Sequence, residues 1–236
     1  MPRMLHCLYM SFLTMLFLEA PAVAQKFDGE PILRPIDGTV MELTQDFSFI
    51  DKTGTVWKAP KGHRTDGASI PRALWSIVGS PFTGRYLHAA IIHDVYCDLK
   101  SRDWRSVHRT FYDAMIANGV TDIQARIMYF AVARFGPRWV TDAKLSCPLG
   151  YHCFSPTPVY VTLAINPVVD VEELRAGIEI IESANLSPAD IEKKADAAFL
   201  NGSVGIRGKE RQGDGRVRQL DQVGNYPSAL NQMLIR

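Results

Sequence analysis

Two short stretches of the chain carry the side chains that could do chemistry. The first, HRTDGASIPRALW at residues 63–75, places Asp66 among turn formers. The second, AAIIHDVYCD at residues 89–98, sets His93 and Asp94 side by side in an apolar run. Imidazole nitrogens and carboxylate oxygens bind zinc-type ions, and ionisable groups are otherwise costly to bury. The pair therefore predicts a divalent-metal site, with Asp66 as a further ligand or as the general base for an activated water.

His108 is a further candidate ligand. It shares a helical stripe with Trp104, Phe111 and Met115, which places it on the inward face of a predicted helix. If this helix packs beside the one that carries His93, two imidazoles and a carboxylate would form an open metal site, with solvent completing the coordination shell. An inward-facing histidine can equally serve packing alone, and the sequence leaves both roles open.

The other polar residues of the first stretch have simpler interpretations. Ser69 precedes Ile70-Pro71 and is the expected N-cap of a short helix. A serine nucleophile needs a base within hydrogen-bond reach and an elbow such as G-x-S-x-G, which the sequence lacks. His63 is predicted to face solvent on its loop.

The same residues could instead tie a loop to the helices without any catalysis. In this interpretation His93 is a hydrogen-bonded core histidine, and Asp94 pairs with an arginine such as Arg64 or Arg72, because a buried carboxylate needs a partner. Two functions therefore stay open. The first is a metal-dependent hydrolase of the cell envelope, and the second is a non-enzymatic binding or scaffold protein of the envelope with a buried polar clasp.

Four ordered motifs carry a family resemblance: GHRTDGASIPRALW, AAIIHDVYC, VHRTFYDAMIANGV and MYFAVARFGPRW. Together they resemble the bacterial and phage family known as domain of unknown function 1353, over about residues 40–139. The resemblance implies no established activity. Many members have an acidic residue at the position of His108. The family pattern carries over onto Asp66, Ser69, Pro71, His93, Asp94, Phe111 and Gly136.

The AAIIHD segment also resembles the metal-binding helix of HD-type phosphohydrolases, which draw ligands from several helices. The matching upstream histidine would be His63 or His88, and the downstream aspartate would be Asp113, Asp122 or Asp142. The segment upstream of the His-Asp pair is predicted as hairpin and loop rather than helix. The likeness is therefore local.

The composition and net charge of the chain limit the classes of partner that it is expected to bind. The chain has 236 residues, of which 47% are hydrophobic, and its formal net charge is +1. The hydrophobic fraction supplies enough apolar side chains for a core, and the net charge lacks the basic excess of a nucleic-acid-binding domain. No nucleic-acid partner is predicted, and a peptidoglycan-derived peptide would suit an envelope hydrolase.

Residues 1–24 are predicted to be a signal peptide. A short segment with Arg3 precedes an apolar run, and Ala22-Val23-Ala24 places small residues before cleavage at Gln25. The apolar run is too short to favour a permanent membrane span. The mature protein is therefore predicted to be periplasmic or secreted.

Three cysteines follow the predicted leader. In an oxidising compartment Cys147 and Cys153 could close the loop CPLGYHC as a disulfide and leave Cys97 as a thiol. Pairing of Cys97 with either of the other two stays open, because spacing alone does not fix the connectivity.

The segments that must position these residues indicate an α+β fold. Strand-like runs between Thr39 and Ala59, with turn formers from Asp51 to Gly54, predict a small antiparallel hairpin sheet. A capping box at Thr121 is expected to open the last core helix. Packing of the hairpin sheet on short helices would make residues 25–145 one α+β core domain. The helices are predicted at about residues 71–78, 83–98, 104–118 and 121–135.

A C-terminal extension is predicted over residues 146–201. It contains a strand in YVTLAI and two helices, one with an apolar stripe from Val171 and one opened by Ser187-Pro188. Residues 202–236 are polar and glycine-rich without an apolar period, which predicts a disordered tail.

Overall fold

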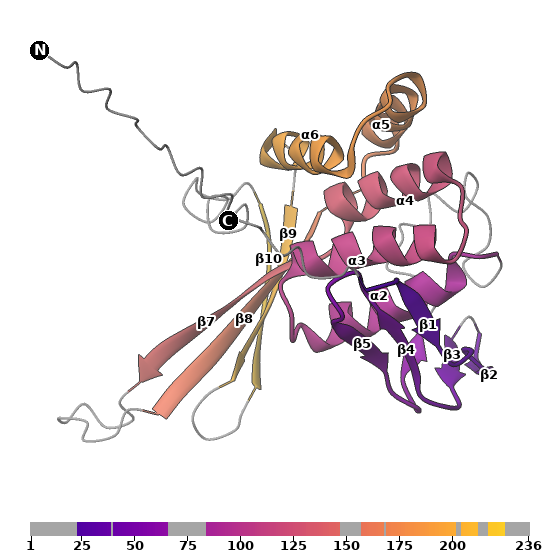
Figure 1. Cartoon of the computed structure of the whole chain (residues 1–236). Coiled ribbons are helices and arrows are strands. Elements are labelled where there is room, and N and C mark those ends of the chain that lie inside the picture. Colours follow the sequence, from indigo (N-terminus) through magenta and orange to yellow (C-terminus); the bar gives the residue numbers. More distant parts are fainter. Residues whose placement is uncertain are drawn as a thin grey trace, which may run out of the picture.

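A computed structural model describes residues 23–38, 40–65, 84–146, 157–167, 169–201, 204–211 and 217–224. Within these residues, small antiparallel sheets pack beside several helices, which confirms the predicted α+β class (Figure 1). None of the helices described is long and apolar enough to cross a membrane. The predicted leader, apart from residues 23–24, and the predicted helix at 71–78 lie outside the described residues. So do Asp66, Ser69, Arg72, Cys147 and Cys153.

The predicted hairpin is confirmed as strands β4 (Phe47–Ile50) and β5 (Val56–Ala59). Strand β1 (Lys26–Asp28) pairs with β4 and completes a three-stranded sheet. Alternate residues of the hairpin strands are buried, as the two-residue period of a half-buried sheet requires. Asp51 closes the turn, since its Oδ1 accepts hydrogen bonds from backbone N–H groups of the turn itself.

A second three-stranded sheet contains the first residues of the HRTDGASIPRALW stretch. It consists of β2 (Leu33–Asp37), β3 (Val40–Leu43) and β6 (Arg64–Thr65), in that order. Thr65 in β6 is buried and faces the neighbouring helix. This short strand is therefore what brings the start of the first motif against the His-Asp pair.

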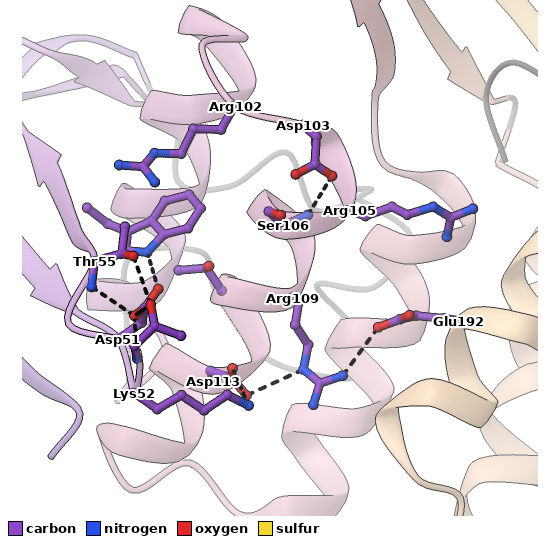
Figure 2. Close-up of a pocket in the computed structure, with 13 residues that line it drawn as sticks. Asp51, Lys52, Thr55, Arg102, Asp103, Arg105, Ser106, Arg109, Asp113 and Glu192 are labelled. Atoms are coloured by element: carbon purple, nitrogen blue, oxygen red, sulfur yellow. Dashed lines mark hydrogen bonds and ion pairs between the residues drawn. The ribbon is translucent and has the colours of Figure 1, made fainter. Parts of the chain in front are cut away.

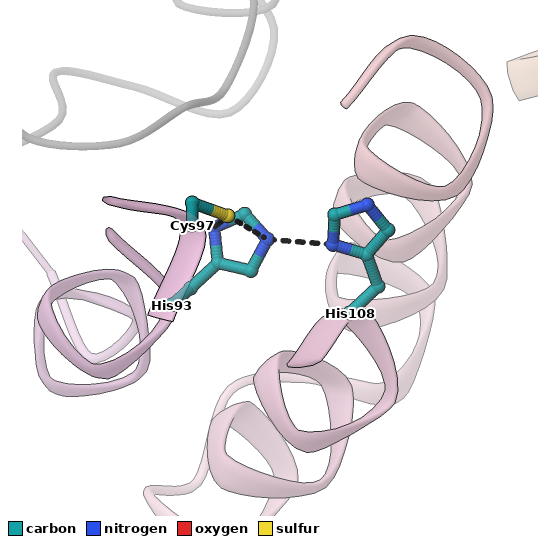
Figure 3. A group of neighbouring side chains, drawn as sticks. All are labelled: His93, Cys97 and His108. Atoms are coloured by element: carbon teal, nitrogen blue, oxygen red, sulfur yellow. Dashed lines mark hydrogen bonds between the residues drawn. The ribbon is translucent and has the colours of Figure 1, made fainter. Parts of the chain in front are cut away.

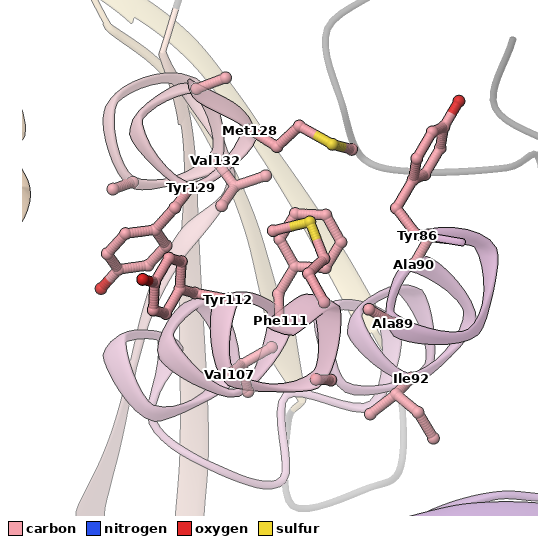
Figure 4. Packing of buried hydrophobic residues seen from close by; sticks show 14 of the residues in the cluster. Tyr86, Ala89, Ala90, Ile92, Val107, Phe111, Tyr112, Met128, Tyr129 and Val132 are labelled. Atoms are coloured by element: carbon pink, nitrogen blue, oxygen red, sulfur yellow. The ribbon is translucent and has the colours of Figure 1, made fainter. Parts of the chain in front are cut away.

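Three helices form the centre of the molecule: α2 (Leu87–Leu99), α3 (Trp104–Ala117) and α4 (Asp122–Phe135). Their apolar side chains interlock in one buried cluster, in which Phe111 of α3 lies between α2 and α4 (Figure 4). The predicted helical spacing of α3 is confirmed, because its buried positions include Val107, Phe111 and Met115.

The ends of these helices follow local signals in part. Asp103 caps α3, and its side chain accepts a hydrogen bond from the backbone N–H of Ser106. Gly119 follows α3 with a φ of 75°, a conformation that favours glycine. The predicted start of α4 at Thr121 is confirmed, since Thr121 is its N-cap residue, but the Thr121 side chain makes no capping hydrogen bond. Asp122 supplies favourable negative charge at this helix N-terminus instead.

Helices α5 (Val171–Ser183) and α6 (Pro188–Asn201) confirm the two helices predicted after the strand. Both pack against α4, and their buried apolar residues belong to the same core cluster as α2 and α3. Gly177 allows the close contact, since a Cβ there would lie 2.1 Å from the Phe130 ring. The two helices thus extend the core of the residues that precede them.

A four-stranded antiparallel sheet extends from the helices in Figure 1. The predicted strand in YVTLAI is confirmed as part of β8. The sequence predicts a disordered tail from residue 202, whereas two of the strands lie beyond it. One of these two strands pairs with β8, and the other pairs with that first strand. Such main-chain pairing needs no apolar periodicity, which is why the pattern did not reveal them. The strands are β7 (Arg138–Ser146), β8 (Thr157–Pro167), β9 (Val204–Arg211) and β10 (Val217–Gly224).

Candidate metal centre

Two of the predicted site residues meet between α2 and α3. Every residue of α2 from Ala89 to Cys97 is buried, so this helix lies in the interior of the fold. His93 and His108 are each only 1% exposed, and the Nε2 atom of His93 lies 2.8 Å from the Nδ1 atom of His108 (Figure 3). The predicted facing of the two histidines across a helix interface is therefore what the structure shows.

Cys97 completes the cluster, although the sequence predicted it only as a disulfide partner or a thiol. Its Sγ lies 3.5 Å from Nε2 and 3.7 Å from Nδ1 of His93. One donor atom from each of His93, Cys97 and His108 lies within 4.8 Å of the other two, so the group could hold a metal ion. The available signal was the spacing, because residues four apart share a helix face. Cys97 is a buried thiol.

Burial controls the protonation of this centre. It lowers the pKa of His93 from its ordinary 6.5 to about 3. Burial also holds the pKa of His108 well below 6.5, and His93 and the Arg138 guanidinium lower it further. Both imidazoles are neutral near pH 7, which is the form that binds a metal. Without a metal, one ring must donate the hydrogen bond that joins them.

The outer nitrogen of His108 lies in an unusual setting. Its Nε2 is buried without a hydrogen-bond partner among the described residues. The Pro137 carbonyl, which raises the pKa of His108, does not reach hydrogen-bond geometry with this atom. A cavity of about 10 Å³, enough for about one water, adjoins His108 on the side of Glu192 and Asp196.

Gly136 permits the close approach of the chain to His108. A Cβ at this position would lie 2.3 Å from the carbonyl oxygen of Val132 and 3.1 Å from Nε2 of His108. Since a real Cβ does not approach a backbone oxygen so closely, any side chain here would displace the end of α4. The motif resemblance drawn from the sequence extends to this glycine, and the contact gives it a physical reason.

Asp94 lies beside the cluster and points to a different partner. Its Oδ2 accepts a hydrogen bond of 2.6 Å from the Thr65 hydroxyl, and its Oδ1 is 4.0 Å from Nδ1 of His93. The predicted partner Arg64 instead lies near Glu42. Asp94 thus ties β6 to α2 and is not one of the three clustered donors. Asp66 follows Thr65 in sequence but lies outside the described residues, so its predicted role stays a prediction.

The remaining histidines and aspartates are engaged elsewhere. His88 pairs with Glu30 at 2.9 Å, and His63, predicted to face solvent, is largely buried 3.9 Å from Asp98. Asp113 and Asp122, the downstream aspartates of the HD-type alternative, pair with the arginines four residues away, and nothing is described of the Asp142 side chain. Among the described residues, the HD-type ligand set is therefore not assembled around His93.

The spacing of the donors bears on whether an ion fits. Ligands on a tetrahedral zinc with bonds of about 2.0–2.1 Å lie about 3.3–3.4 Å apart for a pair of nitrogens. The two imidazole nitrogens, at 2.8 Å, would need to separate by about 0.5 Å on metal binding. The thiol at 3.5 Å from His93 already has a suitable distance. The donor types fit a zinc-type ion, and the geometry needs a small opening between α2 and α3.

Comparison with known proteins supports the family resemblance. The family described as "Protein of unknown function (DUF1353)" matches residues 41–132, a segment that contains all three clustered donors. The uncharacterized protein y4jT of Sinorhizobium fredii is 43% identical over 168 residues, which are 68% of this chain and 48% of that protein. The uncharacterized protein y4iH of the same organism is 43% identical over 126 residues, 52% of each chain.

The chain spans about half the length of these curated relatives. No solved structure matches it. The resemblance read from the motifs is thus confirmed over the core of the chain, and it brings no activity with it.

Proposed function

We propose that this protein binds one zinc-type metal ion through His93, Cys97 and His108. The observation that carries the proposal is the convergence of three buried donors from two helices within 4.8 Å. Burial keeps both imidazoles neutral, so the ion would not compete with protons for the nitrogens near neutral pH. A thiol beside two imidazoles is a donor set suited to zinc.

The same centre supports the proposal of a metal-dependent hydrolase. Three protein donors are the pattern of catalytic zinc sites, whereas structural sites commonly have four. When bound, such an ion supplies the Lewis acid that makes water nucleophilic near neutral pH. His93 and His108 would orient the ion from two helices, and Asp94 would fix α2 against β6. Asp66 is proposed as the general base, because it directly follows the strand that Asp94 holds.

The proposed setting is the cell envelope. Residues 1–24 are proposed to direct export, and a peptidoglycan-derived peptide is the proposed substrate. N-terminal sequencing of the protein from an expressing bacterium should find Gln25 as the first residue. Metal-loaded protein should release new amino groups from purified peptidoglycan, and chelator-treated protein should not. An intact leader, or equal release in both samples, would contradict these proposals.

A buried polar clasp is the second candidate, and one distance favours it. The 2.8 Å hydrogen bond between the two imidazoles satisfies both inner nitrogens without any ion. The Thr65–Asp94 bond likewise satisfies a buried carboxylate. In this alternative the protein is a non-enzymatic binding or scaffold protein, and the centre only stabilises its fold.

Elemental analysis separates the two candidates. The protein is purified without a polyhistidine tag or chelator, and about one equivalent of metal is expected. His93→Ala and Cys97→Ser should each lose it. His88→Ala is the matched control, since His88 lies on the same helix but bonds to Glu30. Absence of metal from the unaltered chain, or its retention in both variants, would favour the clasp.

A further inference from the structure

An open cleft lies on the other side of α3 from the metal centre. It has a volume of about 780 Å³, within the range of small-molecule sites. The β4–β5 hairpin, the outer face of α3 and Glu192 of α6 form its walls (Figure 2). Charged side chains of both signs line it, which distinguishes it from an apolar groove.

The carboxylates of the cleft are already engaged by the protein. Asp51 accepts hydrogen bonds from its turn and from the Trp57 indole. Asp103 caps α3. Asp113 pairs with Arg109, and Glu192 accepts from the same arginine and from a tyrosine hydroxyl. These carboxylates therefore already have hydrogen-bond or ion-pair partners within the protein.

One cation of the cleft lacks a carboxylate partner within the described part of the chain. Lys52 and Arg109 pair with Asp113, and Arg105 pairs with Asp196 at 2.8 Å. Arg102, in contrast, has no carboxylate within ion-pair distance among the described residues. It makes one hydrogen bond to a backbone carbonyl in the hairpin, which leaves most of its N–H groups to other acceptors.

Arg102 is also held in place. Its guanidinium lies 4.2 Å from the ring centre of Trp57 and 5.3 Å from that of Tyr96. Stacking on aromatic rings fixes the plane of the guanidinium and lowers the entropy lost when a ligand binds. A planar, ordered fork of donors matches a planar carboxylate better than a single ammonium group does.

We infer that this cleft binds a small molecule through a carboxylate group, with Arg102 as the anchoring residue. The hydroxyl-bearing side chains of Ser106 and Thr110 line the same cleft and can bind the remainder of a polar ligand. The inference is independent of the metal centre, because His108 lies on the inward face of α3. A peptide with a free C-terminus is the probe that this chemistry suggests.

Calorimetric titration with N-acetyl-alanyl-alanine tests the inference on the full chain. The free acid should bind at one site, and the same dipeptide with an amidated C-terminus should not. Arg102→Gln should weaken binding by about tenfold or more, because a charge-assisted bidentate contact is lost. Arg102→Lys, which keeps the charge without the fork, should weaken it less. Arg175→Gln is the matched control, since Arg175 is an exposed arginine of α5.

Several outcomes would overturn the inference. These are no binding of the acid at millimolar concentration, equal binding of acid and amide, or unchanged affinity in Arg102→Gln. Inorganic phosphate serves as a second probe. If phosphate binds and the dipeptide acid does not, the cleft takes tetrahedral anions and the assignment to carboxylates is wrong. Circular dichroism of each variant confirms that it is folded.

Discussion

Helix α3 separates two polar regions that differ in burial and in the charge of their side chains. Its inward face contributes His108 to a centre that is almost fully buried, whereas its outward face contributes Arg109 and Asp113 to an open cleft. In the centre, polar groups lose their charge and bond to one another. In the cleft, charged groups keep their charge because opposite charges and solvent surround them.

The difference shows what each region can do. Neutral, buried nitrogen and sulfur donors are suited to a zinc-type ion, and an unpaired polar atom there is costly. Ordered charges next to solvent are suited to recognising a polar ligand, and single pairs there contribute little to stability. Substitutions in the two regions should therefore differ in both size and pH dependence.

The largest effect is expected at the glycine that contacts the centre. Gly136→Ala places a methyl group 2.3 Å from the Val132 carbonyl oxygen, and the end of α4 must shift. The free energy of unfolding should fall by about 3 kcal/mol, the upper range for overpacking. Urea denaturation measures this loss. A change below about 0.5 kcal/mol, as for an ordinary surface substitution, would show that the contact with His108 is not tight.

Removing one of the two imidazoles should lower the free energy of unfolding, because its hydrogen-bond partner stays buried. His108→Leu leaves the inner nitrogen of His93 buried with only the weakly bonding Cys97 thiol beside it, so we expect a loss of about 2 kcal/mol in metal-free protein. The double variant His93→Leu/His108→Leu removes both polar groups and should lose clearly less than the sum of the single variants. Additive losses in the urea midpoints would contradict a buried hydrogen bond between the two rings.

The two regions should also respond to different pH ranges. Burial lowers the folded-state pKa of His93 to about 3, so the unfolded chain binds more protons below its pKa of 6.5. Stability of metal-free protein is therefore full above pH 6.5, and His93 lowers it by about 1.4 kcal/mol per pH unit as pH decreases toward 3. The lowered pKa of His108 adds a loss of the same sign.

Asp51 in the cleft changes stability in the same direction but in a more acidic pH range. Burial raises its pKa, but hydrogen bonds from Thr53 and Trp57 outweigh burial and lower the pKa below 3.8. Its contribution is present above that value and is lost only in stronger acid. Urea midpoints measured from pH 7 to 5 should thus fall in the unaltered chain and much less in His93→Leu/His108→Leu. Equal slopes would contradict neutral buried histidines.

The smallest effect is expected in the cleft. Arg109→Gln removes a half-exposed cation that pairs with Asp113 at 3.5 Å and Glu192 at 3.3 Å. The loss should stay below about 1 kcal/mol, because solvent screens such pairs. Thermal denaturation at low and high salt measures it. A larger loss that persists at high salt would mean that the cleft depends on this pair as strongly as the core depends on His108.

Local patterns predicted much of the fold. The hairpin around Asp51 and helix α3 follow from turn residues and from helical spacing, which depend only on neighbours in the sequence. The strands β9 and β10 did not follow, because main-chain pairing stabilises them without any apolar pattern: β9 pairs with the distant strand β8, and β10 pairs with β9. The predicted capping hydrogen bond of Thr121 is not formed, because a matching motif does not ensure that the side chain bonds to the backbone.

For the candidate site, the sequence predicted which helix faces carry the polar side chains. The inward stripe placed His108 correctly, and the apolar run placed His93 in the interior. The role of Thr65 as the partner of Asp94 depends on a two-residue strand, which no periodicity reveals. The sequence predicted Cys97 only as a disulfide partner or a thiol, although its spacing from His93 put both on one helix face. Tertiary contacts, rather than residue types, decided these assignments.

Cobalt titration of chelator-treated protein tests the metal centre most directly. We expect one equivalent of Co²⁺ to bind and to produce a thiolate-to-cobalt charge-transfer band in the near ultraviolet, with visible bands of a four-coordinate ion. Cys97→Ser should remove the charge-transfer band, and His88→Ala should leave the spectrum unchanged. No band in the unaltered chain, or a band that persists in Cys97→Ser, would contradict a centre formed by His93, Cys97 and His108.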